Sequence, residues 1–236
     1  RCPLKYKLSL EWNLAEDTTA NLYFGWAMHA ALFAYFDSVR KERPMTADSV
    51  AEYFLREFDA KPIADVTQRR LYEQDGPRQL RAFLASPAAQ PQGSVAMLEH
   101  RFKCEMAGVQ VVGRIDRVDE DTDGHVIVDY KTGRPKSQDS ADDSVQLSIY
   151  ALAMNGGKPV KALVLQNMED NSTIVTSRST EDLRKTEGLI AKVAARIAAG
   201  EFEAKPGWHC SWCSYRMICP EKEVSLPPSS SGAPRA

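Results

Sequence analysis

The chain has 236 residues, of which 43% are hydrophobic and 26% are charged. This composition is typical of one large globular domain, or of one domain with a small appendage, and it excludes a collagen-like or wholly disordered chain. No apolar run approaches the roughly 20 residues of a membrane-spanning helix, so we predict no membrane segment. The formal net charge is −2, which excludes the strongly basic balance of many nucleic-acid-binding domains. Binding of a polyanion must then use local basic patches or metal ions.

The first third of the chain carries apolar residues at helical spacing. Three helices are predicted, over residues 17–42, 47–59 and 67–84. We expect Asp17, Thr18 or Thr19 to cap the first helix, and an interruption of the third near Gly76-Pro77. The apolar face expected for the first helix consists of Leu22, Trp26, His29, Leu32, Phe33 and Phe36.

The middle of the chain changes to alternating, strand-like segments. Five strands are predicted, over residues 95–104, 109–119, 125–130, 160–168 and 173–177. A strong turn signal, Asp121-Thr122-Asp123-Gly124, joins the second and third strands. Residues 132–143 are expected to form a loop, with Asp142 or Asp143 capping a helix that ends at residue 154. A last helix is predicted over residues 180–199. Helices and strands in this order indicate an α/β or α+β sheet flanked by helices.

Two acidic residues and a lysine fall at the ends of neighbouring predicted strands. Asp116 ends one strand, and the segment Asp129-Tyr130-Lys131 ends the next. Antiparallel pairing brings Asp116 and Asp129 side by side, and the two-residue period puts Asp129 and Lys131 on one face. Converging carboxylates repel each other unless a cation neutralises them. Mg²⁺ or Mn²⁺ suits such oxygen ligands, and Lys131 could orient a water for attack on phosphorus.

The alternative for this group is a surface ion pair between Asp129 and Lys131, with Asp116 as a turn residue. The D-x-K spacing alone favours that alternative, because it is common. The apolar segment Val126-Ile127-Val128 favours the metal site, because a buried strand delivers Asp129 and Lys131 to one point.

Three sequence blocks in this order resemble the RecB-type branch of the PD-(D/E)XK nuclease superfamily. The blocks are Gly113-Arg114-Ile115-Asp116-Arg117, Asp129-Tyr130-Lys131-Thr132-Gly133 and Gln146-Leu147-Ser148-Ile149-Tyr150-Ala151. The resemblance implies an α/β, restriction-endonuclease-like core with a central mixed sheet flanked by helices. It also implies an N-terminal helical region and a C-terminal cysteine cluster.

The same resemblance implies roles for individual residues. Its G-x-x-x-H block is matched at Gly25 and His29. The implied metal ligands are His29, Asp116, Asp129 and the backbone carbonyl of Tyr130. The implied catalytic residues are Asp116, Asp129, Lys131, Gln146 and Tyr150. Without the other blocks, His29 would be assigned as a core histidine, and Gln146 and Tyr150 as ordinary polar residues of a helix. Glu99 is a further acidic candidate.

The cysteines form a second group of candidate ligands. Cys210, Cys213 and Cys219 have C-x2-C-x5-C spacing, and Cys2 lies near the other end of the chain. Four thiolates can hold a [4Fe–4S] cluster or zinc, although zinc ribbons usually show two close pairs. The sequence resembles the iron–sulfur members of the branch, such as AddB-type nuclease domains and CRISPR spacer-acquisition nucleases. That resemblance implies a [4Fe–4S] cluster on these four residues, and Cys104 is expected to be a buried thiol.

The resemblance predicts one nuclease domain over residues 1–220 and a disordered tail over residues 221–236. Within the domain we expect a helical part (1–90), a catalytic core (91–200) and a segment (201–220) that closes onto Cys2. The start at Arg1 is interpreted as that of an excised or processed domain. Candidate phosphate contacts are Lys5, Lys7, Arg114, Arg117, Arg134 and Lys136.

The implied function is that of a metal-dependent DNA nuclease that hydrolyses phosphodiester bonds, an exonuclease on single-stranded ends in DNA repair or recombination. The implied cofactors are Mg²⁺ or Mn²⁺ and a [4Fe–4S] cluster. The implied partners are DNA and a helicase domain or subunit, with no membrane, and the cytoplasm is the expected compartment. The alternatives are a non-catalytic DNA-binding or scaffold domain of a helicase–nuclease complex, and a nuclease that acts on RNA or on another phosphodiester.

Overall fold

The computed structural model describes residues 2–16, 18–154 and 156–221. Except for Glu221, the tail predicted over residues 221–236 therefore lies outside the described residues. The chain divides into two compact units. The smaller unit combines residues 1–18 with 192–236, and the larger unit spans residues 19–191. No helix of the described part has both the length and the apolar character needed to cross a bilayer.

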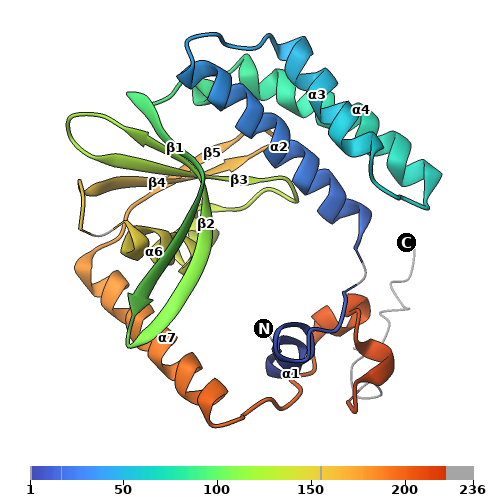
Figure 1. Ribbon diagram of the computed structural model, residues 1–236, viewed down its shortest axis with the longest axis vertical. Coiled ribbons are helices and arrows are strands. Elements are labelled where there is room, and N and C mark those ends of the chain that lie inside the picture. The colour runs from blue at the N-terminus through green and yellow to red at the C-terminus, as the bar shows by residue number, and fades with distance from the viewer. Residues whose placement is uncertain (1, 17, 155, 222–236) are drawn as a thin grey trace, which may run out of the picture. The chain divides into compact units, whose positions relative to one another are not determined.

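The larger unit contains a five-stranded mixed sheet flanked by helices (Figure 1). The strands are β1 (Ser94–Met106), β2 (Val109–Glu120), β3 (His125–Lys131), β4 (Val160–Asn167) and β5 (Thr173–Thr176). They lie in sequence order, and every neighbouring pair is antiparallel except β3 and β4, which are parallel. A parallel pair needs a crossover connection, and here the crossover carries two short helices.

In chain order within the described residues, three long helices precede the first strand, two short helices lie between β3 and β4, and one helix follows β5. They are α2 (Ala20–Arg40), α3 (Ala47–Asp59), α4 (Val66–Leu84), α5 (Gln138–Asp142), α6 (Val145–Ala153) and α7 (Thr180–Ala198), and a 3-10 turn spans Pro87–Ala89. The boundary between the two units falls within α7.

Each face of the sheet has its own core. Helices α2, α3 and α4 cover one face, where Val126, Val128 and Tyr130 of β3 join their cluster (Figure 1). Helix α6 covers the other face and packs on Ile127. Because side chains alternate along a strand, Asp129 and Lys131 share the α6 face with Ile127. The α/β fold class and the mixed sheet flanked by helices are confirmed.

The helix starts follow from capping residues. Thr19 accepts a hydrogen bond from the N–H of Leu22 and so caps α2, one of the three predicted caps. Ser144 caps α6 in the same way, so the prediction of Asp142 or Asp143 at this start is wrong. The loop predicted over residues 132–143 is also wrong in its second half. Ser137 caps the five-residue helix α5 there, which is too short to show helical periodicity in the sequence.

The apolar face predicted for α2 is partly wrong. Leu22, Trp26 and Phe33 are exposed at 46%, 47% and 40%, whereas the buried face includes Met28 and Phe36. Apolar residues occur on all sides of this helix, so their spacing does not identify a single face. The predicted interruption of the third helix does not occur, since α4 runs through Gly76-Pro77.

The smaller unit joins the two ends of the chain. Its elements are α1 (Pro3–Tyr6), a π-helical turn (Lys7–Glu11) and two 3-10 turns (Trp208–Trp212 and Arg216–Ile218). The Tyr215 hydroxyl donates a 2.6 Å hydrogen bond to the carbonyl of Leu14, and the rings of Tyr6 and Phe202 are stacked at 6.2 Å. These contacts hold residues before α2 against residues after α7.

A buried ion pair lies on the face of the sheet that α2, α3 and α4 cover. Arg117 and Asp119 are 3% and 0% exposed, and Arg117 Nε lies 3.0 Å from Asp119 Oδ1. The guanidinium also donates to the Tyr130 hydroxyl at 2.9 Å and lies 4.1 Å from the Phe36 ring centre. Burial raises the pKa of Asp119, and the charge of Arg117 opposes that shift. Arg117 is thus a structural residue, and its prediction as a phosphate contact is wrong.

Removing one partner of this pair should destabilise the fold. Asp119→Ala leaves the Arg117 charge buried without its counter-ion, so we expect a loss of about 3–5 kcal/mol in the free energy of unfolding. Urea denaturation measures it. The matched control is Asp48→Ala, which removes the exposed partner of Arg81 and should have little effect. Equal losses in the two variants would contradict this account.

Candidate metal centre

Three potential metal ligands meet beside the sheet. His29 comes from α2, Glu99 from β1 and Asp116 from β2, and one ligand atom from each lies within 4.8 Å of the other two. His29 Nδ1 lies 3.5 Å from Asp116 Oδ1 and 3.6 Å from Glu99 Oε1. An imidazole nitrogen between two carboxylates is a ligand set that suits divalent transition metals.

Strand pairing explains why the acidic residues meet. Leu98 pairs with Arg117 and His100 pairs with Ile115, so Glu99 lies opposite Asp116. Its backbone has a φ of +46°, an uncommon conformation that costs about 1–3 kcal/mol in a residue other than glycine. Like charges directly across a strand pair are also destabilising. A cation between them would offset that repulsion.

The His29 ring is set between these carboxylates without a close hydrogen bond. Its Nδ1 is buried and has no hydrogen-bond partner among the described residues, and 3.5–3.6 Å exceeds the usual N–H···O range. Burial alone would lower the pKa of His29. Asp116 and then Glu99 outweigh burial and raise that pKa to about 10. The distances of 3.5–3.6 Å between the nitrogen and the two carboxylate oxygens leave a spacing that fits a bound cation.

Asp129 and Lys131 continue the site along β3. The β2–β3 pairing joins Arg117 to Val128, which puts the preceding Asp116 beside Asp129. Lys131 Nζ lies 2.5 Å from Asp129 Oδ2. Asp129 is 2% exposed, so burial raises its pKa and the charge of Asp116 adds to the increase, against the opposing charge of Lys131.

Two residues of helix α6 form hydrogen bonds that link Lys131 to Asp129. The Lys131 ammonium donates to Gln146 Oε1 at 2.8 Å, and Gln146 Nε2 donates to the Tyr150 hydroxyl at 2.6 Å. The Tyr150 hydroxyl donates to Asp129 Oδ1 at 3.4 Å. Burial raises the pKa of Tyr150, and the nearby charge of Asp129 adds to this. These contacts form a closed ring that holds Asp129 and Lys131 in place.

Most of the residues predicted for the site are therefore near one another. For Tyr130 only the backbone carbonyl is predicted as a ligand, and its backbone N–H donates to Asp116 Oδ2 at 2.9 Å. The Tyr130 side chain lies on the opposite face and accepts from Arg117. Glu99 is a stronger member of the site than its sequence suggests. Arg114 holds it through a 2.7 Å contact between Nε and Oε2. The only sequence signal for Glu99 is an acidic residue within a strand.

The four cysteines predicted as cluster ligands line one cavity of the smaller unit. Cys2, Cys210, Cys213 and Cys219 share this cavity with Lys5, Lys205 and Arg216. The backbone N–H of Lys205 donates to Cys2 Sγ at 3.5 Å. Glu221 also lines this cavity, and Lys5 is paired with Glu16 at 2.7 Å. Cys104 is half-buried and packs on the α6-side core.

The spacing of these thiols is relevant to the choice of metal. In a tetrahedral zinc site, Zn–S bonds near 2.3 Å put the sulfur atoms about 3.8 Å apart. Within the described part of the chain, no three cysteine sulfurs lie within 4.8 Å of one another. The described thiols therefore do not have the spacing of a closed zinc site.

Known proteins resemble this chain in sequence family and in fold. The family model described as the PD-(D/E)XK nuclease superfamily matches residues 1–220. A candidate exonuclease from Eubacterium rectale has a similar crystal structure, with a TM-score of 0.52 and 11% identity over 98% of this chain and 84% of that one. The crystal structure of SSO0001 matches with a TM-score of 0.39 and 17% identity, over 93% and 95%. No curated protein sequence matches.

Binding of Mn²⁺ should release a proton. His29 is protonated at neutral pH because its pKa is raised to about 10, and a metal ion displaces that proton. We expect release of about one proton at pH 7, and an affinity that rises with pH up to that pKa. Titration calorimetry in two buffers of different ionisation enthalpy measures the release. His29→Gln should bind more weakly and release less, and an unchanged release in this variant would contradict the assignment.

Proposed function

Because the chain belongs to the PD-(D/E)XK nuclease superfamily, we propose that it is a metal-dependent DNA nuclease that hydrolyses phosphodiester bonds at single-stranded ends. The observation that carries the proposal is the convergence of Glu99, Asp116 and Asp129 with His29 and Lys131. This family uses divalent metals, and Asp116, Asp129 and Lys131 match its catalytic carboxylates and lysine in the sequence blocks. The exonuclease mode and a role in DNA repair or recombination rest on the resemblance of the three sequence blocks to the RecB-type branch.

The proposed metal ligands are His29, Asp116, Asp129 and the carbonyl of Tyr130, with Glu99 as an additional acidic ligand. When bound there, Mg²⁺ or Mn²⁺ offsets the charge that develops on the phosphate and lowers the pKa of a water. The buried His29 nitrogen, which lies 3.5–3.6 Å from one oxygen each of Asp116 and Glu99, supports this set. Burial, and then the adjacent charge of Asp116, raises the pKa of Asp129, and a cation between the two carboxylates would offset both effects.

Lys131 is the residue we propose to face the phosphate. Its ammonium is positioned by the oxygens of Asp129 and Gln146, and its side chain is 24% exposed, so it is open to a ligand. It orients the attacking water and offsets phosphate charge. Gln146 and Tyr150 act through Lys131 and Asp129. They are therefore positioning residues in this mechanism.

The cysteine cavity is proposed to hold a [4Fe–4S] cluster on Cys2, Cys210, Cys213 and Cys219. The four cysteines around one cavity support this assignment. Because the ligands come from both ends of the chain, the cluster would close a long loop and stabilise the smaller unit. It has no part in hydrolysis. A reducing compartment such as the cytoplasm fits free thiols, and a helicase domain or subunit is the proposed partner that supplies single strands.

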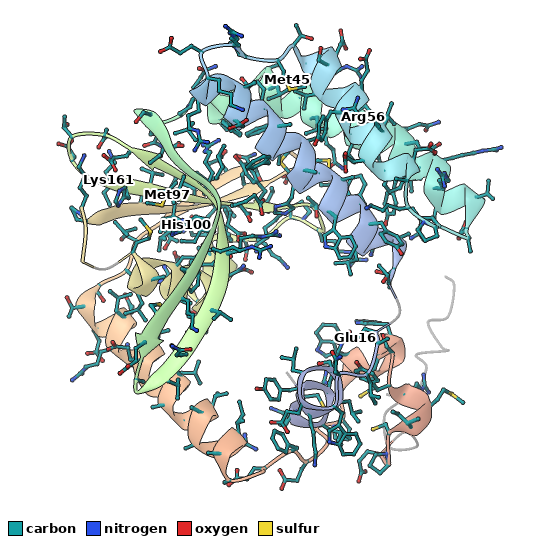
Figure 2. All side chains as sticks on the ribbon, viewed as in Figure 1. Glu16, Met45, Arg56, Met97, His100 and Lys161 are labelled. Atoms are coloured by element: carbon teal, nitrogen blue, oxygen red, sulfur yellow. The ribbon has the colours of Figure 1, made fainter. Side chains whose placement is uncertain are left out.

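Loss of Lys131 should abolish cleavage without unfolding the protein. With end-labelled single- and double-stranded DNA and Mg²⁺ or Mn²⁺, we expect wild type to shorten single strands. Lys131→Met and Asp129→Ala should be slower by at least about 100-fold, the effect of losing one charge-stabilising group. The control is Lys161→Met, on β4 and labelled in Figure 2. DNA binding by wild type without cleavage would favour a scaffold domain instead.

Removal of a cluster ligand should have a separate signature. We expect anaerobically purified wild type to be brown and to contain iron. Cys2→Ala and Cys210→Ala should lose the colour and the iron, with lower thermal stability. Cys104→Ala is the control and should keep both. A folded, colourless wild-type protein that contains zinc would contradict the cluster.

A further inference from the structure

One face of α2 exposes aromatic side chains beside the metal centre. Trp26 and Phe33 are exposed at 47% and 40%, and His29 and Ala30 lie between them in the sequence. Positions 26, 29, 30 and 33 have the spacing of one helix face. The His29 ligand candidate is therefore flanked along the helix by two exposed rings that the core of the larger unit does not use.

These side chains line a groove of about 480 Å³. Its helical wall consists of Trp26, His29, Ala30, Phe33 and Tyr53, and its strand wall consists of Glu99, Arg101 and Arg114. The volume is within the range of small-ligand sites, about 300–1,000 Å³. Because His29 and Glu99 belong both to this groove and to the candidate metal centre, a ligand in the groove adjoins the reacting phosphate.

The two walls have complementary chemistry for an unpaired nucleic-acid strand. Exposed aromatic rings stack on bases that no partner strand covers, and arginines contact phosphates. Trp26 also packs edge-on against Tyr23, with ring centres 5.7 Å apart, so a neighbouring ring supports its orientation. The groove is thus aromatic on the helix side, and its strand side carries Arg101 together with Arg114, which is paired with Glu99.

A second groove shares Arg114 with the first and includes other residues of the site. It has a volume of about 560 Å³, and its lining includes Arg114, Asp116, Gln146 and Tyr150. Arg114 lines both grooves. The candidate metal centre therefore lies between two concave surfaces, and a strand that crosses it would occupy both.

We propose that Trp26 and Phe33 form a base-stacking subsite for the unpaired nucleotides that adjoin the cleaved phosphodiester, with Arg101 and Arg114 on their backbone. This inference rests on the proposed function and extends it by naming what selects single strands. In a duplex the bases are stacked and paired with one another, so their faces are not available to these rings. The occupant is single-stranded DNA.

The test combines a change in the protein with a change in the DNA. End-labelled oligothymidylate carries one abasic position, moved stepwise away from the labelled end. For wild type, we expect the abasic position at the subsite to lower kcat/KM about tenfold. Trp26→Ala should lower kcat/KM on intact DNA by a similar factor, mainly through KM. It should also lose most of the abasic effect, because the interaction is then already absent.

Two variants serve as controls. Trp26→Phe keeps an aromatic face and should recover most of the activity, whereas a merely structural role would not require a ring at this exposed position. Leu71→Ala removes a different exposed apolar side chain, 53% exposed on α4, and should behave as wild type. An unchanged abasic penalty in Trp26→Ala, or full activity of that variant, would overturn the inference.

Binding without cleavage separates this inference from the proposed function. Fluorescence anisotropy with Ca²⁺ in place of Mg²⁺ measures the affinity for the same oligonucleotides. If wild type does not cleave DNA in Mg²⁺ or Mn²⁺, but its affinity falls with both the abasic position and Trp26→Ala, the proposed catalysis fails and the subsite stands. If wild type cleaves and neither change affects affinity or KM, the subsite fails and the catalysis stands.

Discussion

Repulsion between carboxylates is the constraint on which the account of this protein depends. Glu99 lies across a strand pair from Asp116, and Asp116 lies beside Asp129 at the end of the next pairing. Without a metal ion, a proton on His29 and the ammonium of Lys131 offset much of this charge. Burial lowers the pKa of His29, and the neighbouring carboxylates of Asp116 and Glu99 outweigh it and raise that pKa. A divalent cation would take over the same electrostatic role and would bring a reactive water with it.

Helix α2 links that constraint to the rest of the fold. Its buried face, which includes Met28 and Phe36, forms the core against the sheet, so the helix has a fixed position above the strands. His29 is carried on this rigid element and not on a loop. Trp26 and Phe33 extend from the same helix on the exposed side. One helix therefore holds a candidate metal ligand and the candidate substrate surface in a fixed relation, as a preorganised site requires.

The sequence predicted the strands, helix α3 and the placement of Asp116 beside Asp129, because these depend on local periodicity and on a short hairpin. It was less informative where longer-range contacts decide. The place of Glu99 depends on an irregular strand and a positive φ, which no local pattern indicates. Arginine is usually an exposed residue type, yet Arg117 is buried and donates hydrogen bonds to Asp119 and Tyr130 in the interior. The buried face of α2 could not be identified from the sequence because the helix carries apolar residues on all sides.

The central claim is that the acidic residues and His29 form a metal site, and anomalous diffraction from crystals grown with Mn²⁺ tests it most directly. The account predicts one strong peak within bonding distance of Asp116, Asp129 and His29, with Lys131 beside it but not bonded to it. A peak elsewhere would contradict the account. So would an empty site at saturating Mn²⁺, with the Lys131 and Asp129 contact unchanged.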